Sequence, residues 1–197
     1  RGEKNMMFVN TAWGLGLGII IDGNLYYGKS GFSGELGHFC MFENEVLCHC
    51  GKKGCLETEA SGSAFHRILM ERYQEGSNTI LAGKLDSGEE ISLGDLLEAV
   101  RKEDVLCIDI LEKMGVNLGK GIAGLMNIFN PELVILGGTL SLAGEYISLP
   151  IKSAIRKYSL NLVNQDTEIK ISKLGERAGA FGACLLSRSK LLGMIHY

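Results

Sequence analysis

Cysteine and histidine residues gather in one short stretch of this chain, and their types and spacing suit a metal site. His38 is followed by Cys48 and Cys50, and Cys55 comes after two glycines. Structural zinc takes four nitrogen or sulfur ligands in a tetrahedron, and His38, Cys48, Cys50 and Cys55 supply such a set. The glycines between Cys50 and Cys55 allow the backbone to fold round an ion. We therefore predict a structural zinc site in this loop.

The composition describes a chain that can bury a core of its own. It has 197 residues, of which 46% are hydrophobic and only two are proline, and this size supports one globular domain without disulfides. The net charge is −3, and the basic runs at residues 1–4 and 52–53 are too short for a surface that contacts nucleic acid. No apolar run approaches the roughly 18 to 20 residues of a membrane span, and the N-terminus lacks a signal-peptide pattern. We expect a cytoplasmic protein with no membrane partner.

Two nearby residues, Cys40 and His49, are rival ligands for the same ion, although His49 lies between two cysteines and would have to turn inward. The alternative to a metal is a disulfide or a set of free thiols in a turn. A reducing cytoplasm disfavours disulfides, so the spacing favours zinc. Cys107 and Cys184 lie in apolar helical patterns, and we expect both to be unreactive thiols of the core.

A glycine-rich segment near the N-terminus offers a second kind of chemistry. Glycines occupy positions 14, 16 and 18 between two apolar runs, and closely spaced glycines let backbone amides surround a phosphate. The signal is weak, because such glycines also permit tight strand packing and no lysine of the Walker type follows.

The elements that must position these residues begin with strands. The apolar runs 6–11 and 17–21 are predicted strands, and Asp22-Gly23 before residues 24–27 predicts a hairpin turn in which both residues take positive φ. The first third is therefore predicted to be a β-meander. Later strands are expected at 133–136, an unbroken apolar run typical of a central strand covered on both faces, and at 168–171.

Helical spacing of apolar residues predicts the other elements. A helix of about four turns starts at Ser61 or Ser63 and ends near Gly76. The polar stretch 77–90 is expected to be an exposed loop, and Ser92 to cap a helix over 93–101. A long helix over 104–129 stops at Asn130-Pro131. Its glycines at 115, 119, 121 and 124 cost about 1 kcal/mol each against Ala and are expected to allow close packing. Helices at 147–158 and 176–192 complete an alternating α/β order.

Together these motifs resemble the ROK family of repressors, open reading frames and kinases. Glu35-Leu36-Gly37-His38 matches the family's Glu-x-Gly-His segment, and residues 48–57 match its Cys-x-Cys-Gly-x-x-Gly-Cys-x-Glu segment at every fixed position. The resemblance continues through residues 130–138 and 174–183. It implies an actin-like ATPase fold of the ribonuclease H type, in which a sugar lies in a cleft between two domains.

The resemblance assigns sugar binding to Glu35, His38 and Glu57. His38 is expected to bind zinc through one ring nitrogen and to face the sugar with the other, so the zinc is structural. A carboxylate accepts hydrogen bonds from two hydroxyls, and a hydroxyl that has its own partner makes discrimination between sugars sharp.

The loop that holds the nucleotide phosphates in the kinases of the family has a different sequence in this chain. They carry Gly-Thr-Gly-x-Gly after the first strand of this domain, whereas residues 12–16 read AWGLG, so Trp13 removes a hydroxyl and adds bulk where phosphate should lie. We interpret Trp13, Gly14 and Gly16, with Gly137 and Gly138 after the later strand, as the remnant of a nucleotide-binding loop. In the kinases of the family the first phosphate loop and the catalytic aspartate lie upstream of the zinc region, so the resemblance implies that neither is among residues 1–197.

Residues 1–197 are accordingly expected to form a single C-terminal domain, with an N-terminal half-domain and any DNA-binding domain outside the chain. The predicted function is the effector domain of a transcriptional repressor that binds a small sugar or amino sugar and reaches DNA only through the missing part. The alternative is the C-terminal domain of a sugar kinase of the glucokinase or N-acetylhexosamine kinase type, and only then are ATP and Mg²⁺ expected cofactors. We also expect a homodimer, formed with the glycine-rich helix and exposed residues such as Met41 and Phe42.

Overall fold

The computed structural model describes residues 2–193 and has a mixed sheet at its centre. The sheet is five-stranded, with the order β3-β2-β1-β4-β5. An antiparallel meander is formed by β1 (Met6–Thr11), β2 (Leu15–Ile21) and β3 (Asn24–Leu25). The strands β4 (Leu133–Gly137) and β5 (Glu168–Ile171) continue the sheet in parallel with β1. The predicted meander and both later strands are confirmed.

The hairpin between β2 and β3 has the predicted turn. Asp22 has φ 51 and Gly23 has φ 79, the two positive values that a type I′ turn requires. The side chain of Asn5 accepts a hydrogen bond from the Asp22 amide at 3.1 Å and fixes the turn to the start of β1. β2 starts at Leu15, earlier than the predicted residue 17, because Leu15 and Gly16 already pair with the end of β1.

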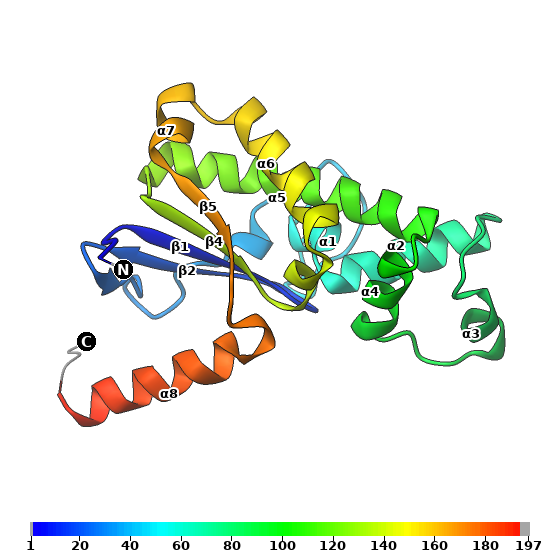
Figure 1. Ribbon diagram of the computed structural model, residues 1–197, viewed down its shortest axis with the longest axis horizontal. Helices are drawn as coiled ribbons and strands as arrows, with labels where there is room; N and C mark the ends of the chain where they lie inside the picture. The colour runs from blue at the N-terminus through cyan, green and yellow to red at the C-terminus, as the bar shows by residue number, and fades with distance from the viewer. Residues whose placement is uncertain (1, 194–197) are drawn as a thin grey trace.

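Two long helices, α5 (Val105–Phe129) and α6 (Glu145–Tyr158), lie side by side over one face of the sheet (Figure 1). Most shorter helices gather at the end of the sheet where β1 and β4 finish. They are α1 (Glu57–Ala60), α2 (Gly62–Gln74), α3 (Ala82–Ser87) and α4 (Leu93–Arg101). α7 (Asn161–Asp166) leads from α6 into β5, and α8 (Ala178–Leu191) extends away from the sheet.

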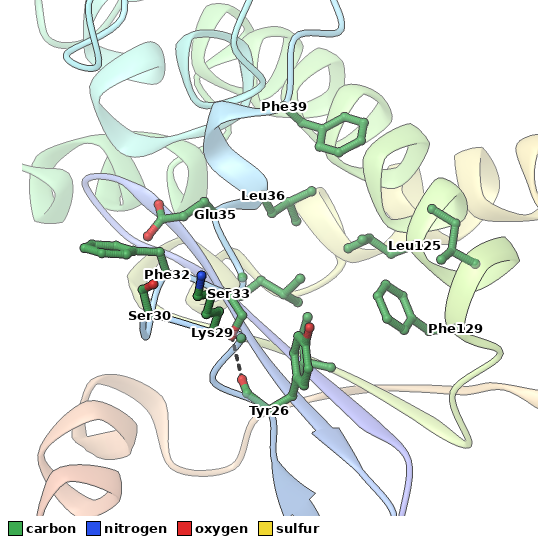
Figure 2. Close-up of a pocket in the computed structure, with 15 residues that line it drawn as sticks. Tyr26, Lys29, Ser30, Phe32, Ser33, Glu35, Leu36, Phe39, Leu125 and Phe129 are labelled. Atoms are coloured by element: carbon green, nitrogen blue, oxygen red, sulfur yellow. Dashed lines mark hydrogen bonds between the residues drawn. The ribbon is translucent and has the colours of Figure 1, made fainter. Parts of the chain in front are cut away.

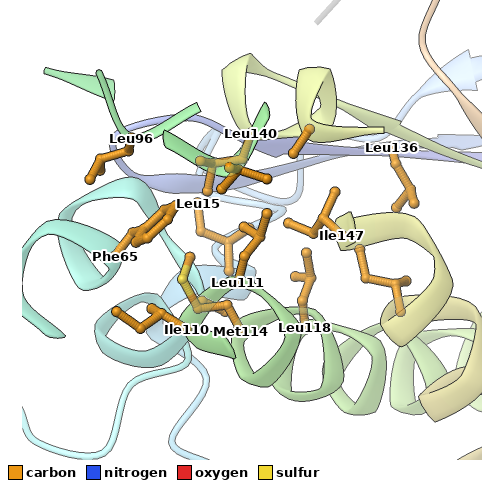
Figure 3. Close-up of a cluster of buried hydrophobic side chains, with 14 of the residues drawn as sticks. Leu15, Phe65, Leu96, Ile110, Leu111, Met114, Leu118, Leu136, Leu140 and Ile147 are labelled. Carbon is orange, nitrogen blue, oxygen red and sulfur yellow. The ribbon is translucent and has the colours of Figure 1, made fainter. Parts of the chain in front are cut away.

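The hydrophobic core lies between the sheet and the pair α5–α6 (Figure 3). Leu111 and Leu118 of α5 are fully buried in one cluster with Leu136 of β4 and Ile147 of α6. Two predicted glycines permit the close approach: a Cβ at Gly119 would lie 2.6 Å from the Ile151 carbonyl oxygen, and one at Gly115 would lie 2.9 Å from Pro150 Cβ. Gly121 makes similar room for Leu56. The same prediction is wrong for Gly124, which faces open space.

The helix ends follow the predicted capping chemistry. The Ser61 hydroxyl accepts from the Ala64 amide, Ser92 and Asp95 form a reciprocal capping box, and Asp104 accepts from the Cys107 amide at 2.9 Å. At its far end α5 stops at Asn130, whose φ of 42 is left-handed, immediately before a proline. The predicted caps at Ser61 and Ser92 and the stop at Asn130-Pro131 are confirmed, whereas the capping by Asp104 is a finding of the structure.

Other expectations need correction. The stretch 77–90 contains α3, because Leu81 is buried and Leu85 packs against the core, with Gly88 closing the helix in the left-handed region. α7 has no counterpart among the predicted helices. Cys107 is buried as expected, but Cys184 is exposed, because α8 buries none of its described side chains.

Candidate metal and ligand site

The segment between β3 and α1 carries Glu35 and the four predicted metal ligands. Gly34 attaches this segment to β2. The Leu17 amide donates to the Gly34 carbonyl at 3.1 Å, and a Cβ at Gly34 would fall 1.9 Å from the Leu17 carbonyl oxygen, so only glycine fits. A 3₁₀ turn, Leu36–His38, follows directly. Two isolated antiparallel bridges, Cys40 with Cys55 and Leu47 with Lys53, then fold the chain back on itself. Glu35 and His38 are thereby held beside the edge of the sheet.

The four predicted metal ligands meet in one cluster. The ligand atoms of His38, Cys48, Cys50 and Cys55 all lie within 4.8 Å of one another. Cys48 Sγ is 3.5 Å from His38 Nδ1, and Cys50 Sγ is 3.6 Å from Cys55 Sγ. Metal–sulfur bonds of about 2.3 Å and metal–nitrogen bonds of about 2.0 Å give a tetrahedron whose edges are roughly 3.5 to 3.8 Å. The cluster therefore has the donor atoms and the size to hold a metal ion.

The thiols of the cluster differ in acidity. Burial raises the pKa of Cys55 to about 12, whereas a hydrogen bond from the Lys52 backbone amide lowers the pKa of Cys50. Only a thiolate binds a metal ion, so an ion here must displace the Cys55 proton. Metal binding is consequently expected to release protons and to weaken in acid.

Neither rival ligand joins the cluster. The Cys40 thiol instead donates to the Lys53 carbonyl at 3.7 Å. His49 lines a hollow of about 180 Å³ together with Glu57, on the inner side of the metal loop and the first turns of α2. The interpretation of Cys40 and His49 as alternative ligands is therefore not supported by their positions.

The predicted sugar-binding residues converge on the same cluster. His38 Nε2 lies 3.7 Å from Glu35 Oε2, so one ring nitrogen faces the metal ligands and the other faces a carboxylate. Glu57 Oε1 is 3.9 Å from Cys48 Sγ, and Glu57 Oε2 accepts the Leu15 amide at 3.0 Å. Glu35 is exposed and Glu57 is half-buried. A ligand that reaches His38 can therefore meet a carboxylate on each side.

The two glycine loops of the predicted nucleotide remnant lie next to each other, because β1 and β4 are parallel and end at one edge of the sheet. Thr11 Oγ1 donates to the Gly137 carbonyl at 3.0 Å, and a Cβ at Gly138 would be 2.3 Å from the Thr11 carbonyl oxygen. Gly14 lies against the Glu57 carboxylate, since its Cβ position is 3.0 Å from Glu57 Oε2. Gly16 belongs to β2 and pairs with Asn10.

Trp13 is half-exposed, and its ring lies 5.9 Å from the ring of His66 in a tilted arrangement. Its carbonyl accepts the Ser63 amide at 2.9 Å, so the loop is fastened to the first turn of α2.

Some residues near Glu57 escaped the sequence analysis. Ser63 and Arg67, one helical turn apart on α2, line the hollow that Glu57 and His49 share. Arg67 donates to the Thr58 carbonyl at 2.8 Å and pairs with Glu71. The spacing of Ser63 and Arg67 is a readable signal, but only the fold shows that this helix face turns toward Glu57.

A second hollow, of about 640 Å³, lies between β2, the segment 26–39 and the C-terminal end of α5. Figure 2 shows Leu36, Leu125, Phe129 and Tyr26 around it, with Glu35 directed away from Leu125 and Phe129. The lining is mostly apolar, and the sequence analysis did not foresee it. The expected exposure of Met41 and Phe42 is wrong, since both are half-buried against the core.

Comparison with known proteins places this geometry in context. The ROK family model matches residues 1–190. A glucokinase of Halalkalibacterium halodurans is 36% identical over 182 residues, which cover 92% of this chain and 55% of that protein. A xylose repressor of Caldicellulosiruptor bescii is 32% identical over 198 residues, covering 98% of this chain and 48% of the repressor. The chain thus spans about half the length of these relatives.

Solved structures show the same division between enzymes and regulators. A ROK family glucokinase from Streptomyces griseus, in complex with glucose and AMPPNP, superposes with a TM-score of 0.84 at 30% identity, covering 96% of this chain and 62% of that one. A ROK family transcriptional regulator, a homologue of the Escherichia coli MLC protein, superposes with a TM-score of 0.78 at 36% identity, covering 85% of this chain and 41% of that one. The fold is thus the α/β fold of ROK sugar kinases and regulators. Among the described residues, no helix combines the length and the apolar character needed to cross a bilayer.

Proposed function

This chain belongs to the ROK family, and we propose that it is the zinc-stabilised, sugar-binding effector domain of a ROK transcriptional regulator. The observation that carries the proposal is the position of Glu57. Its carboxylate holds the Leu15 amide, lies against Gly14 and reaches the metal ligand Cys48. One group thereby connects the ligand site, the glycine loop and the metal cluster.

Zinc is the proposed metal because the donor set is three thiols and one imidazole. Such sets hold structural zinc with no open position for catalysis. The zinc would fix the Nδ1 side of His38, and its neighbour Glu35 would then orient the Nε2 side toward ligand. The metal in this proposal positions a binding residue and takes no part in a reaction.

Sugar binding is assigned to Glu35, His38 and Glu57. A sugar presents hydroxyl donors and acceptors in fixed directions, and these residues offer two carboxylates and one imidazole nitrogen around a common centre. The glucokinase of known structure that this chain superposes on was solved with glucose, which supports a sugar as the ligand class. Glu35 is exposed, so a further part of the longer protein is needed to enclose the sugar.

A regulator is favoured over a kinase by the state of the glycine loop. The Leu15 amide points at Glu57, and the loop carbonyls at Ala12 and Trp13 bind the first amides of α2. By the sequence resemblance, Trp13 replaces the threonine whose hydroxyl the kinases of the family use to hold phosphate. A sensor needs selection for the sugar but does not need to hold phosphate, so this loop suits a regulator.

The second candidate is the C-terminal domain of a ROK sugar kinase. It is supported by the 36% identity to a glucokinase and by the adjacency of the glycine loops after β1 and β4, where a nucleotide could reach both. ATP and Mg²⁺ would then be cofactors, and the catalytic aspartate would have to come from chain outside these residues. We expect no phosphorylation of sugar by this chain alone in either case.

The deciding experiment uses the full-length protein and a panel of hexoses, pentoses and N-acetylated hexosamines. Calorimetry should find a sugar that binds, and that sugar should release the protein from its operator DNA. Glu57→Gln keeps an oxygen for the Leu15 amide but removes the charge, and should weaken binding by about 1 to 3 kcal/mol. Glu98→Gln, an exposed change on α4 remote from the site, is the control.

Two results would reverse this assignment. ATP-dependent phosphorylation with a kcat above about 1 s⁻¹, the ordinary range of enzymes, would make the protein a kinase despite Trp13. Unchanged sugar affinity in Glu57→Gln would move the sugar site elsewhere in the molecule.

We still propose a homodimer, but it must use another surface than the one expected from the sequence. Gly115 and Gly119 of α5 face α6 within the chain, Gly121 faces Leu56, and Met41 and Phe42 are half-buried. A homodimer would instead have to use exposed apolar residues such as Phe32 and Ile128, which are 78% and 69% exposed. Sedimentation at micromolar concentration tests it, and a Phe32→Glu variant that remains a dimer would exclude this surface. DNA contact and a cytoplasmic location remain part of the proposal through the longer protein.

A further inference from the structure

Cys40 lies directly opposite one of the metal ligands. It forms an antiparallel bridge with Cys55, and the flanking hydrogen bonds run from the Met41 amide to the Gly54 carbonyl at 2.8 Å and from the Leu56 amide to the Phe39 carbonyl at 2.9 Å. Because the bonds flank the pair and do not join it, Cys40 and Cys55 form a non-hydrogen-bonded pair. Opposed residues of this kind have their Cα atoms about 4.5 Å apart and their side chains on one face.

That arrangement is within reach of a disulfide. Disulfides join cysteines whose Cα atoms are about 4.4 to 6.8 Å apart. The Cys40 sulfur lies against Gly54, the neighbour of Cys55, where an added Cβ would be 3.1 Å away. The Cys40 thiol now donates to the Lys53 carbonyl at 3.7 Å, so a disulfide requires a rotation about the Cα–Cβ bond of Cys40 that turns its sulfur toward Cys55.

The thiols of Cys40 and Cys55 differ in their exposure to solvent and in whether they belong to the cluster of candidate metal ligands. Cys40 is exposed and is not among the four clustered ligands, whereas Cys55 is fully buried and is one of them. An oxidant in solution therefore meets Cys40 first. Cys50 is also exposed and lies 3.6 Å from Cys55, but as a ligand it would be bound to the metal. Cys40 is the thiol next to the cluster that stays uncoordinated when an ion is present.

We propose that Cys40 and Cys55 are a peroxide-sensitive pair whose disulfide opens the metal site. Hydrogen peroxide oxidises the Cys40 thiol to a sulfenic acid and is reduced to water. The Cys55 sulfur then attacks the Cys40 sulfur, the S–S bond forms, and the hydroxide that leaves takes up a proton and departs as water. Two thiols are oxidised and one peroxide is reduced. Cys55 can no longer donate a thiolate, so the ion keeps only three protein ligands.

The disulfide step stands on the backbone pairing alone, and the metal-release step rests on the proposed zinc site. Oxidation would also loosen the segment that carries His38, because the ion positions that residue. Sugar binding should therefore fall when the disulfide forms and recover on reduction.

The test treats the full-length protein, loaded with zinc, with dilute hydrogen peroxide and maps its disulfides without reduction. A peptide pair linked through Cys40 and Cys55 is expected, together with release of about one zinc per chain to a chromogenic chelator. Dithiothreitol should reverse both. Cys40→Ser should slow zinc release on the order of tenfold at the same peroxide concentration. Cys184→Ser removes an exposed thiol elsewhere in the chain and should behave as wild type.

The outcomes separate this inference from the proposed function. A linkage of Cys50 to Cys55 or to Cys48, or zinc release from Cys40→Ser at the wild-type rate, would overturn it. A protein that holds no zinc but still forms the Cys40–Cys55 linkage would support the thiol pair and refute the zinc site. A zinc-loaded protein in which peroxide leaves Cys40 and Cys55 unlinked would support the zinc site and refute the thiol pair.

Discussion

The segment that carries the candidate site and the helical layer behind it are held by different forces. Between β3 and α1 the chain has one 3₁₀ turn and two isolated bridges, and Phe32, Phe39 and Leu47 are exposed. In the layer formed by β4, α5 and α6, apolar side chains such as Leu118 and Ile122 are buried. The site segment packs Leu36, Met41 and Phe42 against the core and otherwise depends on polar contacts and on its proposed metal ligands, whereas the layer depends on packing throughout.

This difference is typical of a protein in which one region binds ligand and another provides a rigid scaffold. Segments that bind ligands are commonly attached to a rigid scaffold and open more easily than it does. Here the polar attachment points are few: Gly34 at β2, Glu57 at Leu15, and the bridges near the cysteines. If the two regions are this distinct, perturbing one should leave the other folded.

The largest expected effect comes from removing the metal. Chelation, or Cys55→Ala, should raise backbone hydrogen exchange across residues 35–57 by a factor equivalent to several kcal/mol, because metal binding and local folding are coupled. Exchange in β4 and the middle of α5 should stay within a few-fold of the untreated protein. Mass spectrometry of peptides from both regions measures it. Equal loss of protection in α5 would show that the two regions form one cooperative unit.

The second expected effect lies in the helical layer and compares two glycines of one helix. Gly119→Ala should destabilise the protein by roughly 1 to 3 kcal/mol, since its Cβ would meet Ile151 and Ala154 at 2.6 and 2.7 Å. Gly124→Ala should stabilise it by about 0.5 to 1 kcal/mol, because that site is open and alanine favours helix. Urea denaturation measures both. Metal content should be unchanged in each variant, and a loss of metal in Gly119→Ala would break the separation of the two regions.

Local signals allowed much of this fold to be predicted. The Asp22-Gly23 turn, the caps at Ser61 and Ser92, and the cluster of four candidate metal ligands are all decided by residues close together in sequence. Such features need no knowledge of the tertiary structure, because the atoms that satisfy each other belong to neighbouring residues.

Contacts between residues far apart in the chain could not be predicted from the sequence. The contact of Glu57 with the Leu15 amide joins residues far apart in the chain, and nothing local indicates it. An apolar helical pattern also does not indicate which element the helix packs against. Cys184 and Gly124 both lie in such patterns, yet the Cys184 thiol is exposed and Gly124 faces open space. The stretch 77–90 has a polar composition because only Leu81 is buried and only Leu85 is half-buried against the core, and these two contacts fix α3.

Asp104 tests a third way of holding a segment, by hydrogen bonds alone. Its carboxylate accepts from the Cys107 amide, the Ile80 amide and the Thr79 hydroxyl, so it ties the chain before α3 to the start of α5. Burial by itself would raise its pKa, but these hydrogen bonds outweigh burial and the pKa is lowered. Asp104→Asn should cost about 1 to 2 kcal/mol near neutral pH.

The pH dependence gives the check on Asp104. Because the pKa is lower in the folded state, its stabilisation is complete above the unfolded pKa of about 3.9 and is lost as pH falls through the folded value. Thermal unfolding between pH 7 and pH 3 should therefore show the gap between wild type and Asp104→Asn narrowing only in acid. A gap that is constant through this range would mean that the carboxylate charge contributes nothing.

The smallest expected effect is at Asp95, which is more exposed than Asp104 and accepts from Lys84 at 2.6 Å and from the Ser92 amide at 2.9 Å. Lys84 and Ser92 lower the pKa of Asp95 to about 2. Asp95→Asn keeps a capping oxygen but loses the charge, so we expect a cost of about 0.5 kcal/mol, which solvent and salt should reduce further.

Lys84→Met separates the two contributions at Asp95. It removes the ion pair and leaves the capping box, so its cost should vanish at high salt, while part of the Asp95→Asn cost should remain. Because the Asp95 pKa is depressed, both costs should be constant above about pH 4 and decline as pH falls toward 2. Denaturation at low and high salt measures them. If either variant costs as much as metal removal, polar contacts would hold this part of the molecule as firmly as the metal is proposed to hold the site segment, and the contrast between the regions would disappear.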